Sequence, residues 1–328
     1  MQRVILLLAI LMVCQIGMAQ QAPIAIVSTN GTTRLASTLD EASTLAQDND
    51  IIYLPGGMIA GMSNWFTKYV TVIGVGHNPD STVATDATNI QGFIGFMAGG
   101  VLDGVYVLNG IYISSNVKIF RSNCDHIFPP WSNTENVLVD KCIVRSNIIG
   151  HAGYFGFNYS TIKNSIIGFD FTSANTGNTF ENCIFLTEAN YDASGGHMNT
   201  FKNCSFTGIT NWTSGHNHFF RNCLFASSSL PPLTDPNNAS NNILGQSGAA
   251  TFVNAPTTSY SYSNDYIIKP SSPAINGGLG GTQIGIYGGT SPWVKGNVPP
   301  NPHIRTKNVD ATTGAGGTLR VRFNVGAQ

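Results

Sequence analysis

A six-residue motif, Phe-x-Asn-Cys-x-Phe, occurs three times in the middle of this chain of 328 residues and limits how it can fold. The motif starts at Phe180, Phe201 and Phe220, so successive starts are 21 and 19 residues apart. Self-similarity at a period of about 20 residues indicates a stack of equivalent supersecondary units. The sequence therefore predicts a solenoid in which each repeat forms one coil.

Each repeat is expected to form short β-strands joined at a sharp corner. Polar and apolar residues alternate on either side of the motif asparagine, which is typical of strands, and six residues are too few for two turns of an amphipathic helix. Asparagine tolerates the left-handed backbone conformation better than most residues, so it can turn the chain between two strands. A loop and a third strand complete the coil, and neighbouring coils should lie about 4.8 Å apart.

Equivalent residues of successive coils should lie above one another in columns. We expect asparagines at the corner, small inward-facing cysteines beside them, and a stack of phenylalanines. The corner column is predicted to contain Asn123, Asn164, Asn182, Asn203 and Asn222, the cysteine column Cys183, Cys204 and Cys223 with Cys124 and Cys142 as looser members, and the aromatic stack Phe185, Phe206 and Phe225. Lys141 departs from the pattern because it stands where an asparagine is expected.

These repeats, with their corner asparagine, resemble the right-handed parallel β-helix of the pectate-lyase-like superfamily, of the secreted bacterial type. The resemblance covers about residues 35–288. It implies an all-β protein built as a single-stranded, right-handed parallel β-helix with coils of ~20 residues. The superfamily includes lyases, hydrolases, adhesins and phage tailspikes, so the resemblance is specific for the fold and not for an activity.

The first 19 residues have the features of a secretory signal peptide. They contain one arginine, an apolar run over residues 4–13 and small residues at Gly17 and Ala19, which predicts cleavage near Ala19. The apolar run is too short to span a bilayer, and no later segment qualifies as a transmembrane helix. We therefore expect a secreted or cell-surface protein without a transmembrane segment.

Residues 20–289 are predicted to form the β-helix, covered at its first coil by a helix at about residues 38–47. Thr38 and Glu41 have the spacing of a capping box, and an apolar stripe along the same segment would cover the open end of the core. Residues 265–289 resemble the terminal coil of secreted bacterial β-helix proteins, so the solenoid is expected to end there.

A linker rich in proline and glycine, residues 290–302, leads to a tail, residues 303–328, that is predicted to form a β-hairpin. The basic residues of this tail are Arg305, Lys307, Arg320 and Arg322. They either dock on an anionic glycan, an envelope surface or an export system, or they protect an exposed strand edge. We favour the second interpretation because charged residues commonly protect strand edges.

Removal of the signal peptide leaves five cysteines, an odd number for an exported protein. They could form disulfides, bind a metal or remain thiols. Three of them share an inward-facing position, where buried cysteine behaves as a small hydrophobic residue. Because two parallel stacked side chains rarely offer the dihedral angle of a disulfide, we expect thiols.

The composition excludes one class of function. Charged residues make up only 10% of the chain and the net charge is −1, which excludes a nucleic-acid-binding protein driven by bulk electrostatics. A hydrophobic content of 42% together with 36 glycines is typical of a turn-rich β-protein rather than a disordered chain.

The repeat register yields no catalytic site. Lyases of the superfamily use a Lys or Arg base and a group that neutralises a sugar carboxylate, and hydrolases use two carboxylates about 5–9.5 Å apart. The position before the corner asparagine is mixed in charge, and we assign Asp103, Asp125 and Asp140 to different registers. We expect no cofactor; calcium, which requires several clustered oxygen ligands, is the alternative.

Two columns are candidates for ligand contact. His197 and His216 stand four residues before a motif phenylalanine, where adjacent imidazoles could bind a metal or relay a proton, although stacked polar turn residues are the simpler interpretation. Phe171, Tyr191 and Trp212 precede the motif phenylalanine of their coils by eight to ten residues. Facing outwards they would form an aromatic platform for sugar rings; facing inwards they would pack under loops.

These observations favour an exported, non-catalytic protein that binds polysaccharide or another extracellular polymer along one face. The alternatives are a polysaccharide lyase or glycoside hydrolase, which the resemblance implies, and a structural or adhesive surface rod. A Lys or Arg within reach of two aligned carboxylates in a groove would favour the enzyme. A strip of exposed aromatic residues would favour the binding protein, and a polar wall without either feature would favour the rod.

Overall fold

The computed structural model describes most of the chain after the first 21 residues. The described residues are 22–129, 132–146, 156–168, 176–186, 191–192, 197–207, 212–213, 217–230, 238–255, 259–294, 296–314 and 316–327. For residues 191, 192, 212, 213 and 238 only the backbone is described. The signal peptide predicted at residues 1–19 lies outside these ranges.

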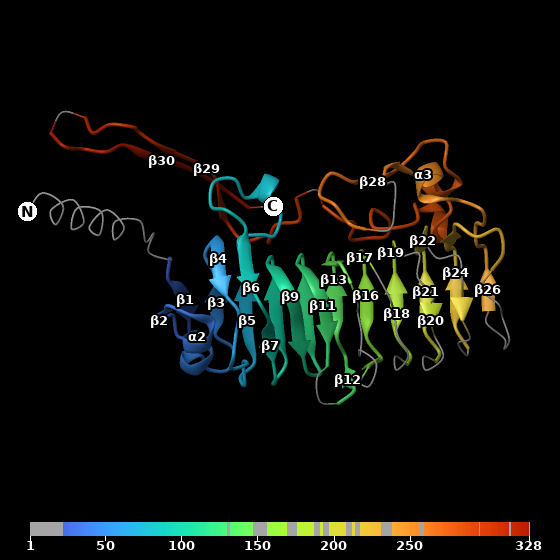
Figure 1. Cartoon of the computed structure of the whole chain (residues 1–328), viewed down its shortest axis with the longest axis horizontal. Helices are drawn as coiled ribbons and strands as arrows, with labels where there is room; N and C mark the ends of the chain where they lie inside the picture. The colour runs from blue at the N-terminus through green and yellow to red at the C-terminus, as the bar shows by residue number, and fades with distance from the viewer. Residues whose placement is uncertain are drawn as a thin grey trace, which may run out of the picture.

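The protein is a parallel β-solenoid whose coils stack along one long axis (Figure 1). The twelve strands of its first sheet are, in spatial order, β2 (Thr33–Ala36), β1 (Ile24–Val27), β3 (Ile51–Tyr53), β5 (Val70–Ile73), β8 (Gly100–Asp103), β10 (Val117–Phe120), β13 (Leu138–Asp140), β16 (Thr161–Lys163), β18 (Thr179–Glu181), β21 (Thr200–Lys202), β24 (Phe219–Arg221) and β26 (Asn238–Ser240). From β3 onwards the neighbours are parallel and follow the chain order. The all-β solenoid predicted from the repeats is confirmed.

A second sheet runs beside the first. Its strands are β25 (Leu224–Phe225), β22 (Ser205–Phe206), β19 (Ile184–Phe185), β17 (Ile166–Ile167), β14 (Ile143–Val144), β11 (Asn123–Phe128), β9 (Tyr106–Ile113), β6 (Thr88–Gln91) and β4 (Gly57–Ala60), with β7 (Ile94–Phe96) paired to β9. Two short parallel pairs join β12 (Thr134–Glu135) to β15 (Phe157–Asn158) and β20 (Tyr191–Asp192) to β23 (Trp212–Thr213). One continuous hydrophobic core fills the space inside the coils.

The strand register places equivalent residues of the repeat above one another. Phe180 pairs with Phe201 and Phe201 with Phe220, and in both steps the stacked ring centroids are 4.9 Å apart. The predicted second stack lies beside the first, with centroids 4.7 and 5.0 Å apart between its successive members Phe185, Phe206 and Phe225. All six rings are buried. The predicted aromatic stack is confirmed.

Four of the five predicted corner asparagines adopt the left-handed conformation that turns the chain. Their φ angles are 46°, 54°, 52° and 54° for Asn164, Asn182, Asn203 and Asn222 respectively. Lys141 occupies the same corner with φ 58°. The solenoid therefore imposes this conformation on whichever residue stands at the corner, and asparagine tolerates it best among non-glycine residues.

Asn123 does not belong to the corner column, and its predicted place there is wrong. The corner of its coil is Arg121, with φ 41°, whereas Asn123 lies two residues later in β11 and pairs with Ile143. The Asn-Cys pair at this point imitates the motif two positions out of register. For the same reason Cys124 aligns with Val144 and not with the cysteine column.

The five described cysteines are buried thiols, as expected. In Cys183, Cys204 and Cys223, on successive coils, each Sγ contacts backbone carbonyl oxygens at 3.3–3.5 Å. Burial raises the pKa of the Cys183 and Cys204 thiols well above the ordinary value, which keeps them protonated and unreactive. The column therefore serves packing rather than chemistry.

A short helix, α2 (Leu39–Leu45), covers the N-terminal end of the core within the predicted range. Thr38 caps it by accepting a hydrogen bond from the Glu41 amide at 3.1 Å. The Glu41 carboxylate accepts one from the Ser37 amide at 2.7 Å, one residue before the position of a standard capping box. Leu39 on its apolar side is buried in the core, so the helix closes the first coil.

The coils end at β26, and the following chain folds back on the solenoid instead of forming a terminal coil. Residues 244–302, here named the C-terminal strap, return along one edge of the solenoid towards its first coils (Figure 1). The strap contains α3 (Gly248–Thr251), β27 (Phe252–Asn254), β28 (Asp265–Ile268) and the 3₁₀ turns η2 (Pro273–Ile275) and η3 (Leu279–Gly281). The segment that resembled a terminal coil therefore packs beside the stack, where it cannot extend it.

The corner column is the strip on which the strap docks. Asn164 donates from Nδ2 to the Ile286 carbonyl at 2.9 Å, and Asn203 accepts through Oδ1 from the Leu279 amide at 2.8 Å. Further corner contacts join Asn222 Nδ2 to the Gly277 carbonyl and Lys141 Nζ to Ser291 Oγ, both at 3.0 Å. The corner side chains thus turn each coil and also bind the strap.

A second hydrophobic cluster joins the strap to the outer face of the second sheet. The solenoid side of this cluster consists of Ile166, Ile184, Leu186 and Leu224. Its buried strap members are Phe252, Ala255, Tyr266, Ile268, Ala274, Ile284 and Ile286. Because burial on both sides removes apolar area from water, the strap is an integral part of the fold.

Replacement of Asn203 by alanine is expected to lower the free energy of unfolding by about 2 kcal/mol. Alanine disfavours the left-handed backbone, and the Leu279 amide loses its acceptor. Chemical denaturation would measure the change. The control is Asn203→Gly, which tolerates the backbone and should recover part of the loss; an alanine variant as stable as the wild type would contradict the corner interpretation.

Part of the connector is buried against the solenoid, whereas the tail is exposed. Residues 296–299 are buried where they cross the first coils, with Asn297 only 1% exposed, so this part of the predicted linker is packed. Beyond it, β29 (His303–Val309) and β30 (Val321–Gly326) form the predicted antiparallel hairpin, which projects away from the solenoid in Figure 1. Apolar side chains such as Phe323, 56% exposed, alternate with exposed arginines. The role of its basic face stays a prediction.

Candidate functional site

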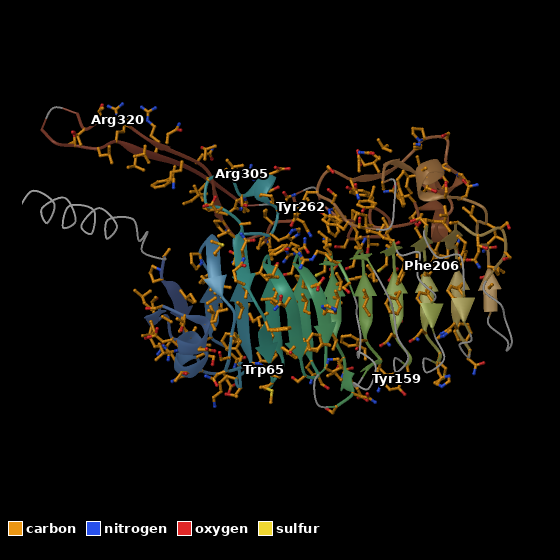
Figure 2. All side chains as sticks on the ribbon, in the orientation of Figure 1. Trp65, Tyr159, Phe206, Tyr262, Arg305 and Arg320 are labelled. Atoms are coloured by element: carbon orange, nitrogen blue, oxygen red, sulfur yellow. The ribbon has the colours of Figure 1, made fainter. Side chains whose placement is uncertain are left out.

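A cavity of about 580 Å³ lies between the strap and the coils. Its aromatic lining comes from the strap and comprises Tyr260, Tyr262, Tyr266, Tyr287 and Trp293. The coils contribute His77, Asn78, Asp80, Ser81 and Ile166. Figure 2 shows Tyr262 at the edge of the solenoid that the strap covers. A concave site with aromatic walls and a few polar groups is typical of small-molecule recognition.

Local turns hold the polar part of the lining. On the solenoid side, Asn78 caps the 3₁₀ turn η1 (Pro79–Ser81) by accepting a hydrogen bond from the Asp80 amide at 3.0 Å. On the strap side, the Asp265 carboxylate accepts from the Ile267 amide at 3.0 Å. Asp80 therefore lines the cavity from a short turn on the solenoid side, and Asp265 lines it from the first position of β28 on the strap side.

A chain of hydrogen bonds ties the strap to three separate coils at the cavity. The Tyr262 hydroxyl donates to the His77 carbonyl at 2.8 Å and accepts from Asn123 Nδ2 at 3.0 Å. It also lies 3.0 Å from His77 Nδ1. Asn297 Nδ2 donates to the Lys141 carbonyl at 2.5 Å and lies 3.4 Å from His77 Nε2. Asn123, which the sequence analysis placed at a corner, therefore helps to bind the strap at this junction.

These contacts determine the protonation of the imidazole. The single hydroxyl hydrogen of Tyr262 goes to the His77 carbonyl, so His77 Nδ1 must carry the hydrogen that it shares with the hydroxyl oxygen. Nε2 is then the acceptor for Asn297. Complete burial lowers the pKa of His77 to about 3, and partial burial raises the pKa of Tyr262 to about 12. Both side chains are therefore neutral at physiological pH.

Acidification from pH 7 to pH 5 is expected to destabilise the protein by about 2 kcal/mol through His77. The folded-state pKa of about 3 is below the unfolded value of 6.5, so between these pH values the unfolded chain binds more protons. This contribution to stability is complete above pH ~6.5 and decreases as the pH falls towards 3. Denaturation at each pH would measure it.

The control is His77→Gln, which has no titratable ring. Asp103 and Asp140, whose carboxyl pKa values are raised by burial, act in the opposite direction but are common to both proteins. The difference between wild type and variant therefore isolates the imidazole. If the two proteins lost the same stability on acidification, the interpretation of His77 as a buried, neutral imidazole would be refuted.

A column of ion pairs lies outside the cavity. Phe120 pairs with Asp103 on one side and Asp140 on the other, so the two aspartates share one column, which corrects their assignment to different registers. Arg121 binds Asp103, and Lys163 Nζ lies 3.5 Å from Asp140. The aspartates are 6% and 7% exposed and neither lines the cavity. We interpret them as structural, because buried charges require partners.

Parallel pairing of β20 and β23 aligns the backbones of Tyr191 and Trp212. Only their backbones are described, so the aromatic platform stays a prediction, and its third member, Phe171, lies outside the described residues. His197 is half-buried, and a parallel bridge aligns it with the preceding coil. His216 lies outside the described residues, so the histidine pair is untested.

A second aromatic cluster lies on the other edge of the solenoid, where Figure 2 labels Trp65. The Trp65 ring stacks on Tyr112 with centroids 4.4 Å apart, and Phe128 meets Tyr112 edge-on at 4.2 Å. Gly95 makes the stack possible, because a Cβ there would lie 2.7 Å from the indole. All three aromatic residues are half-buried.

Sequence reasoning missed the cavity because its aromatic residues lie outside the repeats. Residues 259–262 read Ser-Tyr-Ser-Tyr, and Tyr266 follows four residues later. Three tyrosines in a short segment without the repeat pattern is the signal that could have found this wall. They line the same cavity as His77 because the strap folds back on the solenoid, and no local sequence pattern predicts this fold-back.

Among the described residues, no helix combines the length and the apolar character needed to cross a membrane. Within the same part of the chain, no group of three or more His, Cys, Asp or Glu side chains could hold a metal ion. Comparisons with known protein families, curated proteins and solved structures find no match to this chain. A functional assignment therefore depends on the chemistry of the cavity.

Proposed function

We propose that this is an exported protein that binds polysaccharide, with part of the saccharide held in the cavity beneath the strap. The observation that carries the proposal is a wall of four tyrosines and one tryptophan around about 580 Å³ of space. Aromatic faces pack against the apolar faces of sugar rings, and tyrosine hydroxyls can hydrogen-bond to sugar hydroxyls. Burial raises the pKa of Tyr266 to about 12, so this hydroxyl keeps its proton.

Export and membership of the pectate-lyase-like superfamily are parts of the same proposal. The first 19 residues support export, and the corner asparagines of the solenoid support the superfamily. A solenoid suits a long polymer because its coils offer an extended surface. The second aromatic cluster, at Trp65, offers further contact area on another part of that surface.

The test is retention of the mature protein on a panel of immobilised polysaccharides. At least one should retain the wild type, and Tyr287→Ala should weaken that interaction about tenfold, since aromatic anchors dominate binding energy. The matched control is Tyr159→Ala, which removes a tyrosine that is 61% exposed and remote from the cavity (Figure 2). Absence of retention by every polysaccharide, or equal retention of wild type and Tyr287→Ala, would refute the proposal.

A glycoside hydrolase or polysaccharide lyase is the second candidate. The observation that favours it is that Asp80 and Asp265 line the same cavity, and glycosidases use paired carboxylates. Release of reducing ends, or absorbance of unsaturated products, would be measured on the polysaccharides that bind. For a hydrolase, Asp80→Asn and Asp265→Asn should each abolish release while the protein still folds; no release by the wild type would exclude this candidate.

A further inference from the structure

We infer that the C-terminal hairpin, β29 with β30, docks in the headgroup region of a lipid bilayer that contains anionic lipids, and so holds the solenoid at a membrane surface. The inference goes beyond the proposed function, because no residue of the hairpin lines the cavity. It is carried by an exposed apolar face, by the positive charge of the hairpin, and by one lysine within the apolar face.

One face of the hairpin is apolar and exposed. Successive side chains of a strand point to opposite faces, so Val321, Phe323 and Val325 of β30 share one face. The register pairs Val321 with Val309 and Val325 with Ile304, which adds two aliphatic side chains of β29 to the same face. Apart from Ile304, these residues are between 42% and 56% exposed. The solenoid therefore leaves this face open.

An open apolar face on a two-stranded hairpin requires an explanation. Such a hairpin is at best marginally stable in water by itself, and clustered exposed apolar side chains mark interaction surfaces. Protection of strand edges, the interpretation favoured from the sequence, accounts for the basic residues of the hairpin. It does not account for a row of exposed apolar side chains between them. The two features together are those of a surface that binds an anionic, partly apolar partner.

The positive charge is local to the hairpin. Residues 303–328 contain one acidic side chain, Asp310, and four basic ones, which gives a formal charge of +3 with histidine neutral, whereas the whole chain carries −1. Figure 2 labels Arg320 near the far end of the hairpin and Arg305 at its base. Cations are therefore spread along its length, and each one near an anionic lipid surface strengthens binding about fivefold.

Lys307 distinguishes a membrane from a second copy of this chain. It pairs with Phe323, so its side chain shares the apolar face. Contact between two copies through this face would bury two ammonium groups, and the only carboxylate of the hairpin, Asp310, lies beyond the end of β29. A buried charge without a partner is costly. At a bilayer, the methylene groups of Lys307 stay among the apolar side chains while its ammonium group reaches the lipid phosphates.

The geometry of the hairpin places it within the headgroup region. Its outer strand edges pair with no other strand in the described part of the chain, and unpaired backbone groups are not tolerated in the hydrocarbon core. The headgroup region of each leaflet is about 5–7 Å thick. When the apolar face lies at its inner boundary, Arg322 on the opposite face remains within reach of phosphates, because the hairpin is a single layer of backbone.

The test is co-sedimentation of the full mature protein with lipid vesicles. The probes are vesicles of phosphatidylcholine alone and vesicles of phosphatidylcholine with about one-third phosphatidylglycerol. We expect at least about tenfold tighter binding to the anionic vesicles, and a smaller difference at high salt. Phe323→Ala should weaken binding to the anionic vesicles about tenfold, because the buried area of the ring is lost. Arg320→Gln with Arg322→Gln should weaken it by a similar factor and leave binding to neutral vesicles unchanged.

Matched controls remove the same groups from the coils. Tyr159→Ala removes an exposed ring, and Lys118→Gln with Arg221→Gln removes two exposed charges from the first sheet, so neither variant should change vesicle binding. Since Phe323 is exposed in the folded protein, its replacement should leave stability unchanged, and denaturation of each variant would verify this.

Three results would overturn the inference. They are absence of binding to both vesicles, equal binding to anionic and neutral vesicles, and unchanged binding by Phe323→Ala. A dimer that forms without lipid and dissociates in Phe323→Ala, measured by sedimentation velocity, would assign the apolar face to a second copy instead. Retention of the same preparations on polysaccharides tests the proposed function separately. Retention that is lost in Tyr287→Ala but kept in Phe323→Ala would support that function even if vesicle binding failed.

Discussion

Replacement of Phe201 by alanine is expected to lower the free energy of unfolding by about 3–5 kcal/mol. The ring is fully buried and lies between Phe180 and Phe220, with both centroids 4.9 Å away. It also meets Phe206 edge-on at 5.5 Å. Because parallel pairing holds the neighbouring coils at a fixed spacing, they cannot close the space that the lost ring leaves. Denaturant unfolding would measure the loss.

Two control variants make this result specific. Phe201→Leu keeps much of the volume and should lose clearly less stability than alanine. Phe323→Ala removes a ring of the same size that is 56% exposed on the hairpin, and its effect should be within about 0.5 kcal/mol of zero. If Phe201→Ala were no more destabilising than Phe323→Ala, the stacked column would not hold the coils together.

The repeat register was predictable because each coil encodes it twice, in the phenylalanine and in the asparagine. A side chain that faces the core at Phe180 must do so again at Phe201 and Phe220, since the strands pair in parallel. The corner then follows from φ angles near 50° at Asn182 and Asn203, which asparagine tolerates. Local chemistry and global stacking therefore agree over this region.

Outside the three complete motifs, the local sequence pattern no longer determines the strand register. Asn123 has a cysteine after it, as the motif requires, yet the corner falls on Arg121. Only pairing with the neighbouring coil decides between these two positions, and a shift of two residues preserves the alternation of inward and outward side chains. The same loss of register hid the common column of Asp103 and Asp140.

The candidate site was beyond sequence reasoning for a different reason. Tyr262 reaches His77 across 185 positions of the chain, and Asn297 reaches it across 220. Such contacts exist because the strap reverses direction at the last coil, and the strap itself has no period that would show its course. Aligned residues on neighbouring coils can indicate a site on the solenoid wall, whereas this cavity has the strap as its second wall.

Replacement of Tyr262 by phenylalanine is expected to lower the free energy of unfolding by about 3 kcal/mol and to weaken glycan binding about tenfold or more. The ring remains, but the His77 carbonyl, His77 Nδ1–H and the Asn123 amide lose their common partner. Groups buried without partners carry the full cost of desolvation. Denaturation and calorimetry on the same preparation would measure both effects.

The matched control for Tyr262→Phe is Tyr266→Phe. Tyr266 lines the same cavity, and its hydroxyl accepts one hydrogen bond, from Asn264 at 3.0 Å, where that of Tyr262 takes part in three. Its loss should therefore cost clearly less stability and less affinity. Equal effects of the two substitutions would mean that the hydroxyl of Tyr262 does not fasten the strap to the coils. A larger effect for Tyr262→Phe would show that one hydrogen-bonded junction holds both the closing segment of the fold and the wall of its binding site.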